Sequence, residues 1–147
     1  MIESTFKHGS WVNPLTAVQL AILRPETVLD LGCGDGFYGK LSRRLLPNSK
    51  VTGIDINTSW CKECVDLGVY DKVVNADISW LGWSTFDLII AGDVLEHLEK
   101  EIALSVLTHC CKSSKCTLVN GPVGFQPQNH ELASEIHRCG FSQDDFS

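Results

Sequence analysis

The sequence places an aspartate at the end of each of three successive apolar runs, at Asp30, Asp55 and Asp77. A glycine-rich turn from Gly32 to Gly36 follows the first of them. Glycines in such a turn let the backbone approach a ligand closely and direct its amides at the ligand. If the three runs are neighbouring parallel strands, their acidic ends line one edge of the sheet, where open α/β sheets bind ligands.

The glycine turn alone does not identify that ligand. The turn and the residues after it also satisfy G-x-G-x-x-G, the dinucleotide fingerprint, through Gly34, Gly36 and Gly39. Asp55 stands where a ribose-binding acid belongs, whether or not the ligand is a dinucleotide. Asp30 distinguishes a dinucleotide from a ligand that carries an ammonium group. A carboxylate just before the glycines would repel a pyrophosphate but suits an ammonium group. A nicotinamide dinucleotide therefore becomes the less favoured ligand.

Asp77 completes the pattern, since its carboxylate can accept a hydrogen bond from an exocyclic amine. The three acids together suit a ligand with a cationic amino-acid end, a ribose diol and an adenine amine, and without a phosphate. S-adenosyl-L-methionine has these features.

The elements that must position these residues alternate between strands and helices, as is typical of a doubly wound α/β domain with a mainly parallel sheet. Strands are predicted at 28–31, 51–54, 72–75, 86–91 and 116–120, and helices at 15–23, 37–45, 58–67 and 97–111. In the last helix, Leu98, Ile102 and Val106 should form the buried stripe. The 147 residues suit a single domain over 1–147.

Four segments resemble successive motifs of class I S-adenosylmethionine-dependent methyltransferases of the type 11/12 kind. They lie in the order and spacing of that family, cover about residues 26–121, and read VLDLGCGDGFYG, VTGIDIN, VVNADIS and FDLIIAGDVLEHLEK. The resemblance implies a Rossmann-like core of about five strands, S-adenosyl-L-methionine as the cofactor, and methyl transfer as the activity.

The same resemblance assigns the cofactor site. It implies that the glycine turn cradles the methionine moiety, that Asp30 orders the water or backbone that binds the ammonium group, and that Asp55 takes the ribose hydroxyls. Ile56 would pack on the adenine. The full set of implied cofactor residues is Asp30, Gly32, Gly34, Gly36, Asp55, Ile56, Asp77, Ile78 and Gly92.

The candidates for chemistry follow the fourth strand. Methyl transfer from a sulfonium is an in-line displacement that depends mainly on positioning, with a base to take the proton of a hydroxyl or amine acceptor. Asp93, Glu96 and His97 are predicted as catalytic, because at helical spacing Asp93 shares a face with the other two. The alternatives are a helix N-terminal acid for Glu96 and a packing role for His97.

Residues 93–98 resemble the D/E-x-x-E-H segment of small-molecule O-methyltransferases. They are also similar to that of RNA 3′-terminal 2′-O-methyltransferases, which hold a divalent metal with two acids and two histidines. In that alternative, Mn²⁺ or Zn²⁺ would bind Asp93, Glu96, His97 and His137. A small-molecule acceptor without a metal is preferred over RNA, because the net charge of −6 argues against a nucleic-acid surface. A module that binds the cofactor without catalysis is the third alternative.

Other features are interpreted more simply. No apolar run approaches the roughly 20 residues that span a membrane, and the N-terminus lacks the pattern of a secretory signal, so a cytoplasmic protein is expected. The seven cysteines are expected to be reduced thiols. The pair Cys61 and Cys64, a C-x-x-C, is interpreted as buried packing rather than as a zinc or redox site.

The C-terminal part departs from the family. The strand pair that closes the family's sheet has no counterpart after 116–120, so a truncated or minimal domain is expected, with that strand exposed to pairing or homodimerisation. By family analogy, 121–128 borders the acceptor pocket. Trp11 could cover the cofactor, and Trp80 and Trp83 could wall its adenine side, although ordinary packing is the better explanation for each tryptophan alone.

Overall fold

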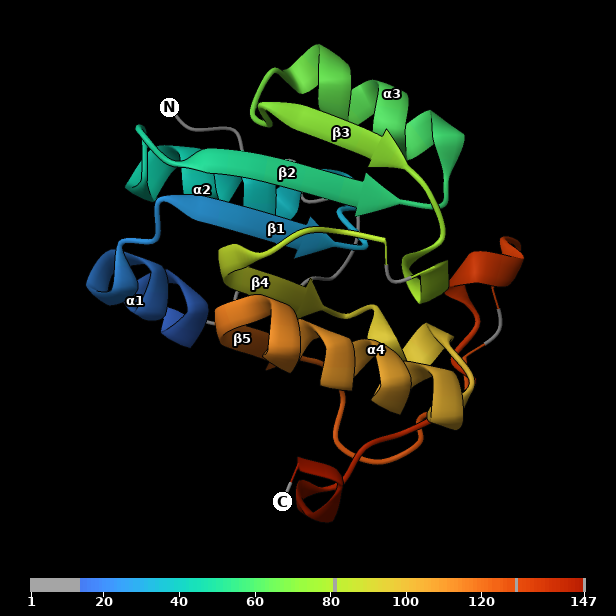
Figure 1. The fold of residues 1–147 in the computed structure, drawn as a ribbon. Coiled ribbons are helices and arrows are strands. Elements are labelled where there is room, and N and C mark those ends of the chain that lie inside the picture. The colour runs from blue at the N-terminus through green and yellow to red at the C-terminus, as the bar shows by residue number, and fades with distance from the viewer. Residues whose placement is uncertain (1–13, 81, 129, 147) are drawn as a thin grey trace.

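Five parallel strands form the sheet of the computed structural model, which describes residues 14–80, 82–128 and 130–146. The strands are β1 (Thr27–Leu31), β2 (Lys50–Asp55), β3 (Lys72–Asn75), β4 (Phe86–Gly92) and β5 (Ser114–Asn120). They lie in the order β3-β2-β1-β4-β5, and every neighbouring pair is parallel (Figure 1). The strand order thus reverses between β1 and β4, which is where such sheets bind ligands.

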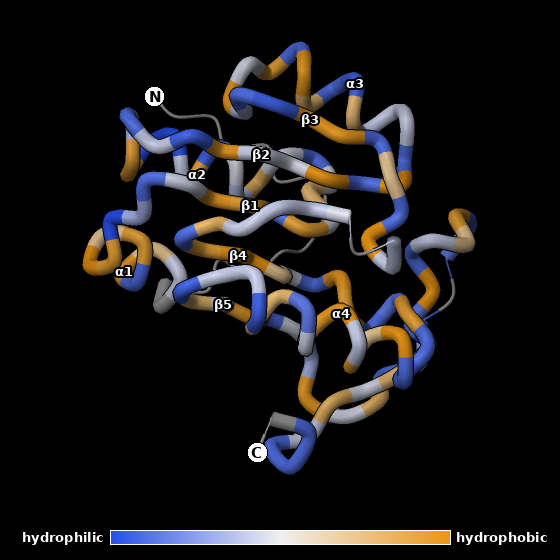
Figure 2. Tube along the Cα trace, in the orientation of Figure 1, coloured by the Kyte–Doolittle hydropathy of each residue, from blue (hydrophilic) through white to orange (hydrophobic). Residues whose placement is uncertain are grey.

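Helices cover both faces of the sheet, and within the described residues they are α1 (Pro14–Leu23), α2 (Phe37–Leu45), α3 (Thr58–Leu67) and α4 (Lys100–Ser113). Side chains alternate across a strand, so β1 contributes to both faces. Val28 packs with Leu20 of α1 and Tyr38 of α2, whereas Leu29 packs with Val106 of α4 on the other face. Figure 1 shows α4 in front of the sheet and α2 behind it. In Figure 2 apolar residues follow β1 and β4.

The predicted doubly wound α/β fold is confirmed, and each predicted strand is present to within two residues of its expected bounds. Local sequence explains where α3 begins and ends. The Asn57 side chain accepts hydrogen bonds from the backbone amides of Ser59 and Trp60. Gly68 then adopts a left-handed conformation, with φ of 64°, which ends the helix.

The predicted helix over 97–111 was wrong at its start and in its buried face. Residues Leu95–His97 form a short 3₁₀ turn, η2, and the chain is extended at Leu98 before α4 begins at Lys100. Because of this break, α4 turns a different set of side chains toward the sheet. Its buried residues include Ala103, Val106 and Cys110, while Ile102 is 42% exposed. The extended backbone of both Leu98 and Glu99 causes the difference, because it interrupts the helical hydrogen bonds between His97 and α4.

The C-terminal segment, defined as residues 121–128 and 130–146, returns across the carboxyl ends of β4 and β5. The backbone of Gly124 pairs with that of Phe141, and the amides of Arg138 and Cys139 donate to the carbonyl of Glu96. Lys100 Nζ also donates to the Gly140 carbonyl at 2.6 Å. These contacts attach the segment to η2 and α4.

In the part of the chain that the structure describes, no strand pairs with the outer side of β5. None of the helices in this part is both long and apolar enough to cross a bilayer.

Candidate functional site

A cavity of about 430 Å³ lies at the carboxyl ends of β1, β2 and β4. Nine of the residues predicted for the site line it, namely Gly32, Gly34, Asp55, Ile56, Asp77, Ile78, Gly92, Asp93 and His97. Four other predicted residues, Asp30, Gly36, Glu96 and His137, do not line it. The three strand ends therefore meet as expected, but the acids among the predicted residues divide between the cavity wall and the layer behind it.

The glycine turn packs against the end of β2. The amides of Gly32 and Cys33 donate to the Ile54 carbonyl, and the Gly34 amide donates to Asp55 Oδ2 at 2.9 Å. Gly32 has φ of 67°, and a Cβ atom there would overlap the side chain of Val94. Both the backbone conformation and the lack of space therefore require glycine at this position.

Asp55 is held in place by backbone amides. Its Oδ1 accepts from the Asn57 amide at 2.7 Å, and its Oδ2 accepts from Gly34. Burial raises the pKa of Asp55, whereas these two hydrogen bonds lower it. The carboxyl group is therefore pre-oriented at the cavity wall, where it can accept from a ligand diol.

Asp30 lies under the turn rather than in the cavity. It shares with Val28 the face of β1 that packs on α2, because alternate residues of a strand point to the same side. Tyr70 donates its hydroxyl hydrogen to Asp30 Oδ2 at 2.6 Å, and the Gly39 amide donates to the Tyr70 oxygen at 3.2 Å. Burial raises the pKa of Asp30 to about 7. In this structure Asp30 thus supports the turn through Tyr70 and makes no wall for a ligand.

Apolar side chains line the part of the cavity that follows β2 and β3. Ile56 lines it while 55% exposed, Ile78 lines it while buried, and Trp60 of α3 adds an aromatic ring. Asp77 lies in the same part of the cavity, where its Oδ1 accepts from the Ser79 amide. An adenine ring matches this combination of apolar faces and an acceptor edge.

Trp80 and Trp83 do not line the cavity, in agreement with the preferred explanation of ordinary packing for each. Trp80 is 71% exposed and does not line the cavity. Trp83 packs against His109, with ring centroids 4.9 Å apart, on the α4 face of the sheet. Trp11 lies outside the described residues.

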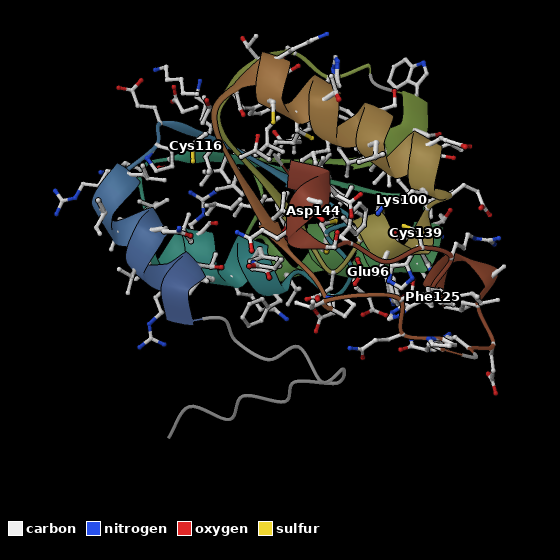
Figure 3. All side chains as sticks on the ribbon, turned by 90° about the horizontal axis from the view of Figure 1, so that it is seen from below. Glu96, Lys100, Cys116, Phe125, Cys139 and Asp144 are labelled. Carbon is white, nitrogen blue, oxygen red and sulfur yellow. The ribbon has the colours of Figure 1, made fainter. Side chains whose placement is uncertain are left out.

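The residues after β4 form two layers. Asp93 and His97 line the cavity, whereas Glu96 is 3% exposed and lies behind them. The expectation that the three share a helical face was wrong, because Asp93 has φ of 50° and precedes a 3₁₀ turn. Figure 3 shows Glu96 beneath the segment that carries Phe125 and Cys139.

Burial sets the protonation of this region. Burial raises the pKa of Glu96 to about 7. Burial also raises the pKa of Asp93, and the neighbouring imidazoles of His97 and His137 offset only part of this rise. Burial lowers the pKa of His97 below its ordinary 6.5. His97 is therefore neutral at pH 7 and has a nitrogen lone pair available, as a general base requires.

Glu96, His97 and His137 form a cluster that could hold a metal ion. One ligand atom from each lies within 4.8 Å of the other two, although Glu96 and His137 are 41 positions apart in the sequence. The His137 Nδ1 atom lies 2.7 Å from the Gln126 carbonyl oxygen. Asp93, the fourth residue of the predicted metal set, is not in this cluster.

Comparison with known proteins agrees with this geometry. A family model described as a methyltransferase domain matches residues 28–115, which include β1 through the start of β5 and therefore most of the cavity wall. The chain belongs to this methyltransferase family. The resemblance of its motifs to class I S-adenosylmethionine-dependent methyltransferases is thus confirmed.

Two curated relatives show how varied the acceptors of such methyltransferases are. Trans-aconitate 2-methyltransferase of Klebsiella pneumoniae is 28% identical over 80% of this chain and 47% of its own length. Ribosomal RNA small subunit methyltransferase C of Buchnera aphidicola is 30% identical over 67% of this chain and 31% of its own. The chain thus spans less than half the length of either relative.

Solved structures share the fold at low identity. TehB from Haemophilus influenzae is 18% identical and superposes with a TM-score of 0.74 over 96% of this chain and 50% of its own. A plantazolicin methyltransferase, BpumL, in complex with SAH is 20% identical, with a TM-score of 0.56 over 69% of this chain and 44% of its own.

Several residues of this methyltransferase cavity were not predicted from the sequence. They are Cys33 and Asp35 of the glycine turn, Phe37 and Tyr38 of α2, Trp60 of α3, Val94 and Leu98 beside η2, and Ala133, Ser134, Glu135 and Arg138 of the C-terminal segment. The helical ones had a signal, because the first turns of α2 and α3 directly follow the glycine turn and Asp55. The residues of the C-terminal segment had no sequence signal beyond the family analogy, because their position depends on contacts with η2 and α4.

Proposed function

We propose that the cavity binds S-adenosyl-L-methionine and that the protein transfers its methyl group to an oxygen or nitrogen atom of a small molecule. The observation that carries the proposal is the charge around the cavity. Five carboxyl groups and one guanidinium line it among the described residues: Asp35, Asp55, Asp77, Asp93, Glu135 and Arg138. Such a wall favours a cationic ligand and opposes one that carries phosphates.

The fit to the cofactor follows the length of the cavity. The glycine turn would receive the methionine end, Asp55 the ribose hydroxyls, and the apolar end at Ile56 and Ile78 the adenine. The sulfonium would then lie toward Gly92 and Asp93, next to His97. Membership of the methyltransferase family supports this assignment, as does SAH in the complex of BpumL.

His97 is proposed as the general base. The acceptor's lone pair attacks the methyl carbon, the carbon–sulfur bond breaks, and the cofactor leaves as S-adenosylhomocysteine. The acceptor's proton passes to the neutral imidazole. Asp93, on the same wall, would stabilise the imidazolium that forms, since it already interacts with His97 electrostatically.

Calorimetric titration with S-adenosylmethionine and S-adenosylhomocysteine tests the cofactor site. We expect micromolar binding, weakened by about ten-fold or more, ~1.4 kcal/mol, in Asp55→Ala. Asp66→Ala is the matched control, because it removes an exposed carboxylate of α3 that does not line the cavity. Absence of binding by folded protein, or an equal loss in both variants, would contradict the proposal. Binding without turnover of any acceptor would indicate the non-catalytic module.

A divalent cation is a second candidate component, favoured by the cluster of Glu96, His97 and His137. One carboxylate and two imidazoles suit Mn²⁺ or Zn²⁺. The Gln126 carbonyl holds His137 Nδ1, as carbonyls commonly hold the non-ligating nitrogen of metal-bound histidines. A cation bound there would act as a Lewis acid toward an acceptor hydroxyl, such as an RNA 2′-hydroxyl.

Titration with Mn²⁺, followed by electron paramagnetic resonance, tests this second candidate without any acceptor. We expect one bound ion per chain in the wild type and none in His137→Ala or Glu96→Gln. His109→Ala is the control, because His109 packs on Trp83 away from the cluster. If the wild type binds no Mn²⁺ and no Zn²⁺, methyl transfer without a metal remains as the proposal.

A further inference from the structure

Two thiols meet where the glycine turn contacts α3. The Sγ atoms of Cys33 and Cys64 lie 4.0 Å apart, although the residues are 31 positions apart in the sequence. Cys33 lines the cavity, whereas Cys64 is fully buried behind it. Both are free thiols. The C-x-x-C motif drew attention to Cys61 as the neighbour of Cys64, but the structure brings a different cysteine to it.

We propose that Cys33 and Cys64 form a reversible disulfide that joins the glycine turn to α3 and weakens binding of the cofactor. The site of oxidation stands on the geometry of the two thiols alone. The effect on the cofactor rests, in addition, on the proposed function of the cavity.

The contact between the turn and α3 changes when this bond forms. A disulfide holds its sulfur atoms about 2.05 Å apart, so the two Sγ atoms must approach each other by about 2 Å. Cys64 Sγ now donates a hydrogen bond to the Gly34 carbonyl at 3.2 Å, and this bond is lost with its hydrogen. Because Gly34 also carries the amide that donates to Asp55, we expect the loss of this bond to disturb the position of Asp55.

Cys61 faces a different part of the fold. Its Sγ atom lies 3.4 Å from the Asp55 carbonyl and 3.9 Å from that of Val74, on the β2 and β3 side of α3. Cys61 and Cys64 are three residues apart on a regular helix, each with its own backbone acceptor. The geometry thus favours Cys33 over Cys61 as the partner of Cys64.

Hydroperoxide is a suitable oxidant because it is small enough to enter the cavity. Cys33 Sγ attacks one peroxide oxygen, the oxygen–oxygen bond breaks, and a sulfenic acid and one water form. Cys64 Sγ then displaces the hydroxyl group from Cys33, which gives the disulfide and a second water. Both thiol protons end in the water. A dithiol reductant reverses the reaction by thiol exchange.

The rate of this oxidation should increase with pH. The thiolate is the form that attacks the peroxide. The hydrogen bond between the two thiols, burial and the Asp30 carboxyl raise the pKa of Cys33, while the same hydrogen bond lowers the pKa of Cys64. Cys33 is nevertheless the thiol that attacks, because it is the one of the two that lines the cavity. A bound cofactor should slow the reaction as well, because it would cover Cys33 in the cavity wall.

Peptide mapping of the full chain after hydrogen peroxide treatment identifies the bond. Trypsin cleaves after Lys40, Lys50, Lys62 and Lys72, so Cys33, Cys61 and Cys64 fall in three separate peptides. We expect the Cys33 and Cys64 peptides to be linked, with the loss of two hydrogen atoms, and the Cys61 peptide to stay free. Linkage of Cys61 to Cys64, or oxidation of Cys33 without linkage, would overturn the site.

Calorimetry with S-adenosylhomocysteine measures the consequence. We expect the oxidised chain to bind at least about ten-fold more weakly than the reduced chain, and a dithiol to restore the affinity. Cys64→Ser should bind equally well with and without peroxide, while the matched Cys61→Ser should respond like the wild type. Unchanged affinity of a fully linked chain would overturn the proposed effect. No binding even by the reduced chain would overturn the proposed function, and with it the effect, while the peptide map would still decide the site.

Discussion

The two halves of the cavity are built in different ways. The cofactor half consists of strand ends and the tight turns that follow β1 and β2, where hydrogen bonds to neighbouring backbone fix each side chain. The acceptor half consists of η2 and the C-terminal segment, which is attached by long-range contacts such as that of Arg138 with the Glu96 carbonyl. Under the proposed function, the first half would hold the cofactor and the second would select the methyl acceptor.

Removal of His97 should have the largest effect, and only on the acceptor half. General bases typically contribute about 10²- to 10⁴-fold in rate, so His97→Ala should lose turnover by that factor while its affinity for S-adenosylhomocysteine stays within about two-fold. Transfer of labelled methyl groups to a panel of acceptors measures turnover. Because the pKa of His97 is lowered, activity should persist below pH 6.5 and fall only at lower pH. Equal losses of turnover and affinity would contradict the division into halves.

A Cβ atom at Gly32 should disrupt the cofactor half. The left-handed conformation costs about 1–2 kcal/mol and overpacking against Val94 about 1–3 kcal/mol, so Gly32→Ala should lower the free energy of unfolding by about 2–5 kcal/mol. Gly68→Ala is the control, because Gly68 has φ of 64° with open space around it and should show only the conformational cost. Urea denaturation compares the two. Similar losses would mean that contact with Val94 is unimportant.

One buried acid lies behind each half of the cavity, Asp30 behind the cofactor half and Glu96 behind the acceptor half. Both should make the stability of the fold depend on pH. Their pKa values are raised from 3.8 and 4.5 to about 7. Between about pH 4 and pH 7 the folded state therefore binds more protons than the unfolded state. The free energy of unfolding should therefore fall as pH rises from about 4 to about 7. Asp30→Asn and Glu96→Gln should each flatten part of this slope in urea denaturation, whereas Asp66→Asn should not.

Release of the C-terminal segment should have the smallest effect on stability. Lys100 Nζ forms an ion pair with Asp145 at 2.8 Å and lies 4.3 Å from the centre of the Phe141 ring. Partly exposed pairs of this kind contribute about 0.2–1 kcal/mol, so Lys100→Met should lower stability by about that amount. Turnover should fall and cofactor affinity should not. Lys115→Met removes the pair of an exposed lysine with the half-buried Asp87, which does not line the cavity, and should change neither turnover nor cofactor affinity.

Periodicity and turn chemistry were sufficient to predict the strand ends and the glycine turn that line this half of the cavity, because both are determined locally, whereas the roles given to their residues came from the family resemblance. Strand ends place Asp55 and Asp77 at the sheet edge, and Gly32 marks a turn that no other residue can form. The contact of the Asp30 carboxyl group with Tyr70 was not predicted, since it joins residues 40 positions apart. Nothing in the local sequence around Asp30 indicates that contact.

The acceptor half was predicted less well, for the same physical reason. The break at Leu98 separates η2 from α4, and it puts Glu96 behind the cavity wall instead of beside Asp93. His137 was proposed only as a metal ligand, and Glu135 and Arg138 were not predicted at all. Their positions depend on how the C-terminal segment packs, which a helical pattern cannot reveal.

A direct comparison of two ligands tests the central claim, that the cavity binds an adenosyl ligand without phosphates. Calorimetric titration of the wild-type chain with S-adenosylhomocysteine and, separately, with NAD⁺ decides it. We predict micromolar affinity for S-adenosylhomocysteine and no measurable binding of NAD⁺, because the carboxylates of the cavity repel a pyrophosphate. Tight binding of NAD⁺ with none of S-adenosylhomocysteine would contradict the account and make the glycine turn a dinucleotide site.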